Sequence, residues 1–227
     1  MSLREEVEAN GFAIRDIAVT DAGLMQALDE DIRRSPLRNK AGMRHAMSLR
    51  SVRDIASCQA MRKLAYEILG GSAFPFRATI FEKSPAANWL VVWHQDTALP
   101  LEHKLDVLGW GPWSTKQGIQ YAHAPAEVLS QVLALRLHLD DSTSENGPLR
   151  VLPGTHNLGL LSDDDIHALS EQIRSVECVV PKGGVVAMRP LVLHASSKSR
   201  TELPRRVLHI EYAASESIAS PLDLEIV

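Results

Sequence analysis

The chain has 227 residues, 45% of them hydrophobic and 23% charged, and a net charge of −4, which is typical of a folded globular protein and excludes a disordered one. Because no group of lysines and arginines is dense enough to bind a phosphate backbone, we expect no nucleic-acid partner. No apolar run is long enough to span a membrane, the N-terminus is charged and only two cysteines occur, which predicts a cytoplasmic protein without a membrane partner or a disulfide framework.

The N-terminal region, about residues 1–72, is predicted to be mainly helical. Thr20 or Asp21 can cap a first helix, and apolar residues at helical spacing predict a second helix over 49–69. The polar segment 35–47 between them lacks periodicity and is expected to be a loop, to which the sequence assigns no role. Helices with one apolar face are expected to pack on a sheet.

The region from about residue 73 to residue 214 changes to short apolar strands separated by Gly and Pro turns. This succession favours a sandwich or jelly roll over a parallel sheet. The exception is 97–125, which is rich in Trp, Gly and Pro and is predicted to form a lid over the site. A solvent-facing insertion whose tryptophans only pack is the alternative. We expect both regions to belong to one domain, 1–227.

One strand closes with Trp93-His94-Gln95-Asp96. Side chains of a strand alternate between its two faces, so His94 and Asp96 project from the same face. An imidazole and a carboxylate are two of the three ligands in the 2-His-1-carboxylate triad that holds non-haem iron(II). His194, at the end of a second apolar strand, is the best candidate for the third ligand. A His-x-Asp string alone is common by chance, so the prediction depends on the combination.

The segment 131–140 alternates cleanly between leucines on one face and polar residues on the other, which predicts a strand. Arg136 and His138 share the polar face. If this face points into the interior of the jelly roll, the Arg136 side chain can contact a substrate carboxylate or a cosubstrate. The alternative is a strand that faces solvent on that side.

The order His94-x-Asp96, His194 and Arg205, eleven residues after His194, resembles the phytanoyl-CoA dioxygenase family of iron(II)- and 2-oxoglutarate-dependent oxygenases. The run 146–156 and the string His194-Ala195-Ser196 are also similar to motifs of that family. The resemblance implies a mainly β fold, a double-stranded β-helix or cupin-like jelly roll, with the N-terminal helices packed on one sheet.

The resemblance also implies iron(II) as the metal, 2-oxoglutarate as cosubstrate and O2 as co-reactant. The implied metal ligands, which are also the catalytic residues, are His94, Asp96 and His194. The implied cofactor-binding residues are Arg205, which grips the distal carboxylate of 2-oxoglutarate, Ser196 and Lys83; the candidate substrate contacts are Arg136 and Trp113. A planar, permanently charged guanidinium suits a dicarboxylate in a partly dry pocket, although a solitary arginine is more often a surface cation.

The implied reaction hydroxylates a small-molecule substrate and releases succinate and CO2. Family halogenases carry a small residue at the position of Asp96, so Asp96 favours a hydroxylase. A non-catalytic, cupin-like protein that binds a metal or a small ligand is the alternative, and a hydroxylase of peptides is a third reading. The sequence leaves open the substrate, the exact type of oxidation and the oligomeric state.

Overall fold

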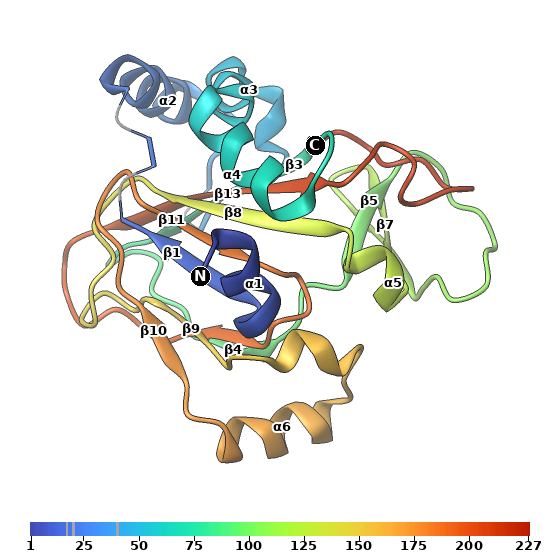
Figure 1. The fold of residues 1–227 in the computed structure, drawn as a ribbon. Coiled ribbons are helices and arrows are strands. Elements are labelled where there is room, and N and C mark those ends of the chain that lie inside the picture. Colours follow the sequence, from blue (N-terminus) through green and yellow to red (C-terminus); the bar gives the residue numbers. More distant parts are fainter. Residues whose placement is uncertain (17, 20, 40) are drawn as a thin grey trace.

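A computed structural model describes residues 1–16, 18–19, 21–39 and 41–227 (Figure 1). Its main framework is a six-stranded antiparallel sheet that faces a smaller, four-stranded antiparallel sheet. The strands of the large sheet, in order across it, are β1 (Phe12–Arg15), β11 (Val185–Met188), β8 (Val132–His138), β13 (Arg205–Ala213), β3 (Phe74–Lys83) and β2 (Gly42–Met43). Those of the small sheet are β10 (Val176–Cys178), β9 (Leu149–Val151), β12 (His194–Ser196) and β4 (Val91–His94).

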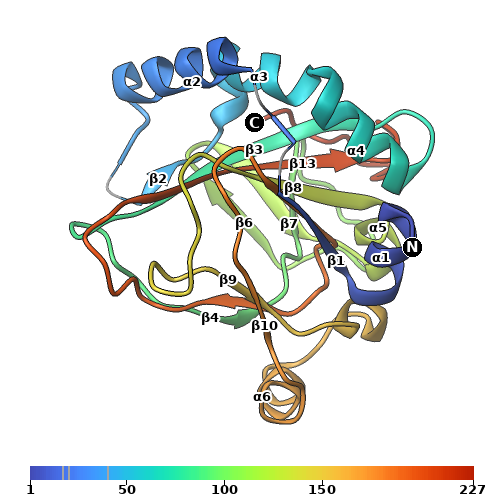
Figure 2. The same cartoon turned by 60° about the vertical axis from the view of Figure 1, so that its left-hand side comes forward.

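Helices cover the outer face of the large sheet, as the two views in Figures 1 and 2 show. They are α1 (Leu3–Asn10), α2 (Ala22–Arg34), α3 (Arg50–Ser57) and α4 (Gln59–Leu69), with a 3-10 turn over Ala46–Ser48. Their apolar residues form one core cluster with the outward side chains of the sheet, including Leu133, Leu135 and Leu137 of β8. Burial of this apolar surface is the main force that fixes the helices on the sheet.

A second cluster fills part of the space between the two sheets and contains Leu149 and Val151 of β9 and Val186 and Met188 of β11. The jelly roll with helices packed on one sheet is therefore confirmed. The two hydrogen-bonded sheets are separate, so among the described residues the jelly roll is a two-sheet sandwich without a closed barrel. The division of the chain into regions of a single domain stays a prediction.

A third, three-stranded sheet lies beside this sandwich (Figure 1). It consists of β5 (Ala98–Leu101), β7 (Ile119–His123) and β6 (Trp113–Lys116), and is followed by the short helix α5 (Ala126–Leu129). The expectation that 97–125 has no regular structure is therefore wrong. Its strands are short and lack a period-two apolar pattern, which is why the sequence gives no strand signal there. We call this unit the lid sheet.

Other expectations hold with changed boundaries. Asp21 caps α2, accepting hydrogen bonds from the backbone of Gly23 and Leu24, whereas Thr20 lies outside the described residues. The helix expected over 49–69 is two helices, because the backbone is extended at Cys58. The apolar strand that the sequence places before His194 is not formed, because β12 begins at His194.

The remaining elements lie near the small sheet. The 3-10 turn Thr155–Leu158 leads to α6 (Asp163–Gln172), which contacts β4. Ser162 and Asp165 form a capping box at the start of α6, which satisfies amide groups that the helix leaves free. No helix among the described residues is long and apolar enough to cross a membrane.

Leu137 offers a test of the core between the helices and the large sheet, because its side chain is fully buried there. We expect Leu137→Ala to lower the free energy of unfolding by about 2–5 kcal/mol, through lost burial and the cavity left behind. Leu203→Ala is the control, since Leu203 is 71% exposed; it is expected to change the stability by less than about 0.5 kcal/mol. Urea denaturation measures both. Equal effects would show that Leu137 is not in the core.

Candidate metal centre and its cavity

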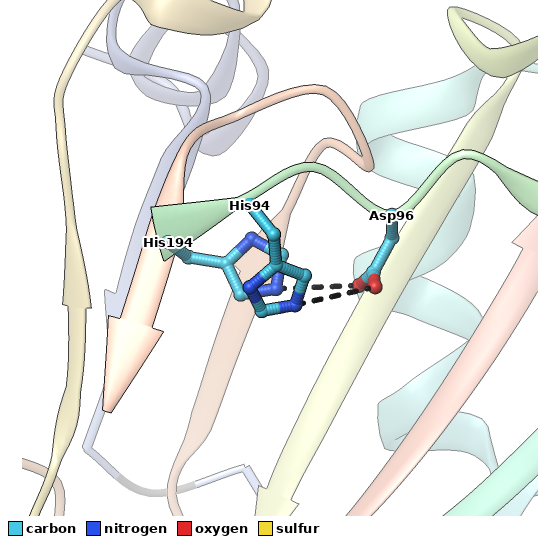
Figure 3. Close-up of side chains that lie close together, drawn as sticks. All are labelled: His94, Asp96 and His194. Atoms are coloured by element: carbon cyan, nitrogen blue, oxygen red, sulfur yellow. Dashed lines mark ion pairs between the residues drawn. The ribbon is translucent and has the colours of Figure 1, made fainter. Parts of the chain in front are cut away.

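The two histidines of the predicted triad meet across neighbouring strands. In the antiparallel pairing of β12 with β4, His194 lies directly opposite His94, and the centroids of the two rings are 4.2 Å apart (Figure 3). Directly opposite side chains on one face of a sheet are close neighbours. The register of these two strands therefore brings together residues that are far apart in the sequence.

Asp96 lies two residues beyond the end of β4, and its backbone amide donates a hydrogen bond to the carbonyl of Pro190 at 2.9 Å. Its carboxylate oxygens lie 3.8 Å from Nε2 of His94 and 3.4 Å from Nε2 of His194, as the dashed lines in Figure 3 mark. The potential ligand atoms of all three residues lie within 4.8 Å of one another. The triad predicted from the sequence is thus assembled in space.

The hydrogen bonds of the imidazoles set which nitrogen faces the centre. Nδ1 of His94 is 2.8 Å from the carbonyl of Val92, and Nδ1 of His194 is 2.9 Å from the carbonyl of Val192. A carbonyl only accepts, so Nδ1 carries the proton in each ring and Nε2 keeps a free lone pair directed at Asp96. This is the arrangement in which a backbone carbonyl orients a metal-binding imidazole.

The charges at the triad also suit a cation. Burial lowers the pKa of His94, and the adjacent His194 lowers it further, so His94 is neutral at pH 7. Burial alone would raise the pKa of Asp96, but the two imidazoles and more distant groups hold it well below its usual value. Two imidazoles and an ionised carboxylate form the donor set that binds divalent iron and similar metals. The residues present therefore fit the implied metal.

The inner face of the large sheet carries a polar ladder, set by the registers of β3, β13 and β8. Lys83 is opposite Arg205 at one end of the ladder. His209 is opposite Arg136 near its middle. Arg77 is opposite Glu211, with which it forms an ion pair, at the other end. Alternate residues of each strand point inward, so a single face of three strands supplies all these groups.

Arg205 and Lys83 form a cationic end to this ladder. Both are buried, and Nζ of Lys83 donates hydrogen bonds to Oγ of Ser196 at 2.6 Å and to the carbonyl of Ser197. Nη2 of Arg205 reaches the same Oγ at 3.5 Å, while its Nε has no hydrogen-bond partner among the described residues. Burial, together with repulsion from Arg205, Arg136 and Arg150, lowers the pKa of Lys83 to about 7.

Further polar atoms on this face also lack partners. Nη1 of Arg136 is 2.9 Å from Nδ1 of His209, but Nε of Arg136 and both ring nitrogens of His138 have no partner in the described part of the chain. Arg136 is 7% exposed, which excludes the alternative of a solvent-facing strand. Buried polar groups without protein partners indicate a place that a polar ligand or water completes. Beside the cations Arg205 and Lys83, this fits a dicarboxylate such as 2-oxoglutarate.

A cavity of about 360 Å³ joins the triad to these cations. It is lined by all but one of the residues predicted from the sequence: His94, Asp96, His194, Arg205, Ser196, Lys83 and Arg136. The exception is Trp113, which lies on β6 and packs against the apolar cluster of the lid sheet. The structure gives no support to Trp113 as a substrate contact, because it does not line the cavity.

One wall of the cavity consists of residues that the sequence does not predict to be part of the site. Asn39 and Arg44, from the segment 35–47, and Gln117, from the turn between β6 and β7, line it together with the triad. Neither segment carries a recognisable motif, and only their position beside the inner face of β3 makes them part of the site. The pairing of Met43 with Ile80 fixes the first segment there.

Comparison with solved structures supports the fold. AviO1 from Streptomyces viridochromogenes has a TM-score of 0.67, with 21% identity and 93% of each chain covered. EctD from S. alaskensis, solved with 2-oxoglutarate and 5-hydroxyectoine, has a TM-score of 0.70, with 15% identity; 94% of this chain and 76% of EctD are covered. SnoN, a non-haem α-ketoglutarate-dependent epimerase from nogalamycin biosynthesis, has a TM-score of 0.67, with 17% identity over 92% of this chain and 80% of SnoN.

Sequence comparison gives the family. The chain is 28% identical over 181 residues to the L-proline trans-4-hydroxylase of Streptomyces griseoviridis, an alignment that covers 67% of this chain and 59% of that relative. The chain thus spans only about three fifths of the relative's length. The model of the phytanoyl-CoA dioxygenase (PhyH) family matches residues 18–207, which include the triad and Arg205. The chain therefore belongs to the phytanoyl-CoA dioxygenase family.

Proposed function

We propose that the protein is a non-haem iron(II)- and 2-oxoglutarate-dependent dioxygenase that hydroxylates a small molecule and releases succinate and CO2. The observation that carries the proposal is the cavity in which His94, Asp96 and His194 share a wall with Arg205 and Lys83. Family membership and the proline hydroxylase relative support the same reaction class.

In this proposal His94, Asp96 and His194 hold the iron and leave its other coordination positions open. Bound iron(II) would supply the redox and O2 chemistry that amino-acid side chains do not perform. The chain itself orients the reactants and keeps bulk water away from them. The Nδ1 hydrogen bonds of both histidines keep their Nε2 atoms aimed at the centre without a rearrangement.

Arg205 and Ser196 would bind the distal carboxylate of 2-oxoglutarate, since the guanidinium and the hydroxyl meet at the buried end of the cavity. Lys83 adds a third donor that also contacts Ser196. Low local dielectric strengthens charge-assisted hydrogen bonds of this kind. The unpaired Nε of Arg205 is available for the same carboxylate.

Hydroxylation is the favoured outcome within the class. Asp96 provides a carboxylate ligand where a halogenase needs a free position for chloride. The epimerase among the structural relatives shows that this fold also hosts other reactions, so the choice depends on Asp96 and on the hydroxylase relative. A cavity of about 360 Å³ is near the lower end of the range for small-molecule sites and favours a metabolite over a peptide.

Anaerobic addition of iron(II) and 2-oxoglutarate to the protein tests the proposal. We expect a weak visible charge-transfer band, followed by formation of succinate when O2 is admitted. No band in folded, iron-loaded protein would contradict the proposed function. A band without succinate, even with a broad panel of metabolites, would instead favour the cupin-like binding protein.

Asp96→Ala removes one of the three proposed metal ligands. We expect it to lower the affinity for iron(II) by about 100-fold or more, because even residues that only support metal ligands contribute 10- to 100-fold, and to abolish succinate formation. Anaerobic calorimetry with iron(II) measures the affinity. The control is Asp106→Ala, since Asp106 is exposed and outside the cavity. Parent-like iron affinity in Asp96→Ala would remove Asp96 from the ligand set.

Arg205 and Arg206 form a matched pair on β13, because consecutive strand residues face opposite ways. Arg205 lines the cavity, whereas Arg206 forms ion pairs with Asp140 and Asp29 outside it. We expect Arg205→Gln to weaken 2-oxoglutarate binding by about 100-fold, through loss of a buried, charge-assisted contact. Arg206→Gln is expected to lower stability but to keep the affinity. Equal 2-oxoglutarate affinities in the two variants would contradict the role of Arg205.

The lowered pKa of Lys83 predicts that the protein takes up a proton when 2-oxoglutarate binds. With a pKa of about 7 it is mostly neutral at pH 8, and a nearby dianion favours its charged form. We expect 2-oxoglutarate to bind with uptake of close to one proton at pH 8 and almost none at pH 6, where Lys83 already carries its proton. Calorimetry in buffers of different ionisation enthalpy gives the number of protons taken up. Lys83→Met is expected to abolish the uptake at pH 8; unchanged uptake in that variant would assign the proton elsewhere.

A further inference from the structure

Two cations lie on segments that the proposed binding of iron and 2-oxoglutarate does not use. Arg44 follows β2 and lines the cavity, and Lys116 ends β6 just before Gln117, which also lines it. Both approach Tyr121 and the Arg77 end of the polar ladder. The register of β2 with β3 places Arg44 beside Thr79, four residues before Lys83, which is roughly 13 Å along the strand. Arg44 and Lys116 therefore form a second cationic group, distinct from that of Arg205 and Lys83.

The segments that carry these two cations are tied together. Nε2 of His45, the residue after Arg44, lies 3.1 Å from the hydroxyl of Tyr121 on β7. Nζ of Lys116 lies 4.9 Å from the centre of the same tyrosine ring, a cation–π distance. Tyr121 is buried, so it gives a fixed support to Lys116 and to His45, the neighbour of Arg44.

Neither cation is neutralised by the protein. Among the described residues, no carboxylate lies within 4.0 Å of Arg44 or Lys116, whereas the neighbouring Arg77 is paired with the buried Glu211. Burial lowers the pKa of Lys116, and repulsion from Arg44 and Arg77 lowers it further, whereas the carboxylate of Asp96 raises it. Like charges held close together without a paired carboxylate favour binding of an anion.

The backbone beside each cation has a left-handed conformation. His45 and Gln117 have φ angles of 55° and 52°, and among the described residues they are the only ones other than glycine with positive φ. At Gln117 this is the geometry that the two-residue turn between β6 and β7 requires, whereas at His45 it is uncommon for a side chain with a Cβ. The two residues directly follow Lys116 and Arg44, on separate segments.

The charge balance of the cavity leads to the same conclusion. Among the described residues, its lining includes the cations Arg44, Lys83, Arg136 and Arg205 but only one carboxylate, Asp96. A divalent metal and the 2-oxoglutarate dianion cancel each other. The occupied site therefore keeps an excess of two or three positive charges, depending on whether Lys83 is protonated, and Arg44 carries one of them on the side facing Gln117 and Asn39.

We propose that the substrate carries an oxyanion, a carboxylate or a phosphate, and that Arg44 and Lys116 bind it while the rest of the molecule extends toward the triad. This inference rests on the proposed function, in which the cavity is the active site. It assigns Arg44 and Lys116 to substrate selection and leaves the metal and cosubstrate to other residues.

Binding to a matched panel of probes tests the proposal. The protein is loaded with nickel(II) in place of iron and with 2-oxoglutarate, so that no turnover occurs. The panel has three arms on shared small skeletons: carboxylic acids, including L-proline; phosphate monoesters; and the corresponding amides or alcohols, including L-prolinamide. Ligand-observed NMR finds the binders and calorimetry measures their affinity.

We expect the binders to fall in one of the two anionic arms, which identifies the oxyanion, and to bind about ten-fold or more tightly than their uncharged counterparts. The double variant Arg44→Gln with Lys116→Gln is expected to lose about ten-fold or more of that affinity. Lys104→Gln is the control: Lys104 is an exposed lid cation outside the cavity, and its loss is expected to change nothing. The affinity is also expected to fall with added salt.

Three results would overturn the inference: neutral members that bind as tightly as the anionic ones, no anionic member that binds below about 5 mM, or parent-like affinity in the double variant. Circular dichroism of the double variant shows whether it is folded. The affinity is also measured for each single variant, in which only one exposed or partly exposed side chain is changed. Failure of the proposed function is distinguishable, because it shows as absent 2-oxoglutarate binding in the parent protein before any probe is added.

Discussion

The pairing of β12 with β4 is the constraint on which the rest of the site depends. It sets His194 opposite His94 and leaves Asp96 just past the strand end, where the backbone bond to Pro190 holds it. A shift of one residue in this register would turn one imidazole to the other face of the sheet. The flanking strand β9 pairs with β12 on its other side, so the register is fixed from both edges.

The large sheet serves two purposes through the alternation of its side chains. Its outer face is apolar and is covered by α1 to α4, which supplies the burial that stabilises the fold. Its inner face carries Arg136, His138, His209 and Arg205, all buried and only partly hydrogen-bonded. Burying such groups is unfavourable unless something pairs with them. The helices on one face thus stabilise a sheet whose other face carries buried polar groups that a polar ligand or water can complete.

The sequence predicts those parts of the site that depend on local pattern. Strand alternation places His94 with Asp96 and Arg136 with His138, and family motifs supply His194 and Arg205. It does not predict the wall formed by Arg44 and Gln117, because these residues reach the cavity only through long-range pairing of β2 with β3 and through the position of the lid sheet. The same limit applies to Trp113: β6 places it against an apolar cluster and not in the cavity wall, and its role as a substrate contact stays a prediction.

One cavity joins the proposed metal ligands His94, Asp96 and His194 to the cations Arg205 and Lys83. The central claim is that the metal binds to His94, Asp96 and His194 with 2-oxoglutarate directed at Arg205. The most direct measurement is anomalous diffraction at the iron edge from crystals grown anaerobically with iron(II) and 2-oxoglutarate. The account predicts a single iron peak bonded to both Nε2 atoms and to the carboxylate of Asp96, with the distal carboxylate of 2-oxoglutarate on the guanidinium of Arg205. Iron bound elsewhere, or 2-oxoglutarate remote from Arg205, would contradict it.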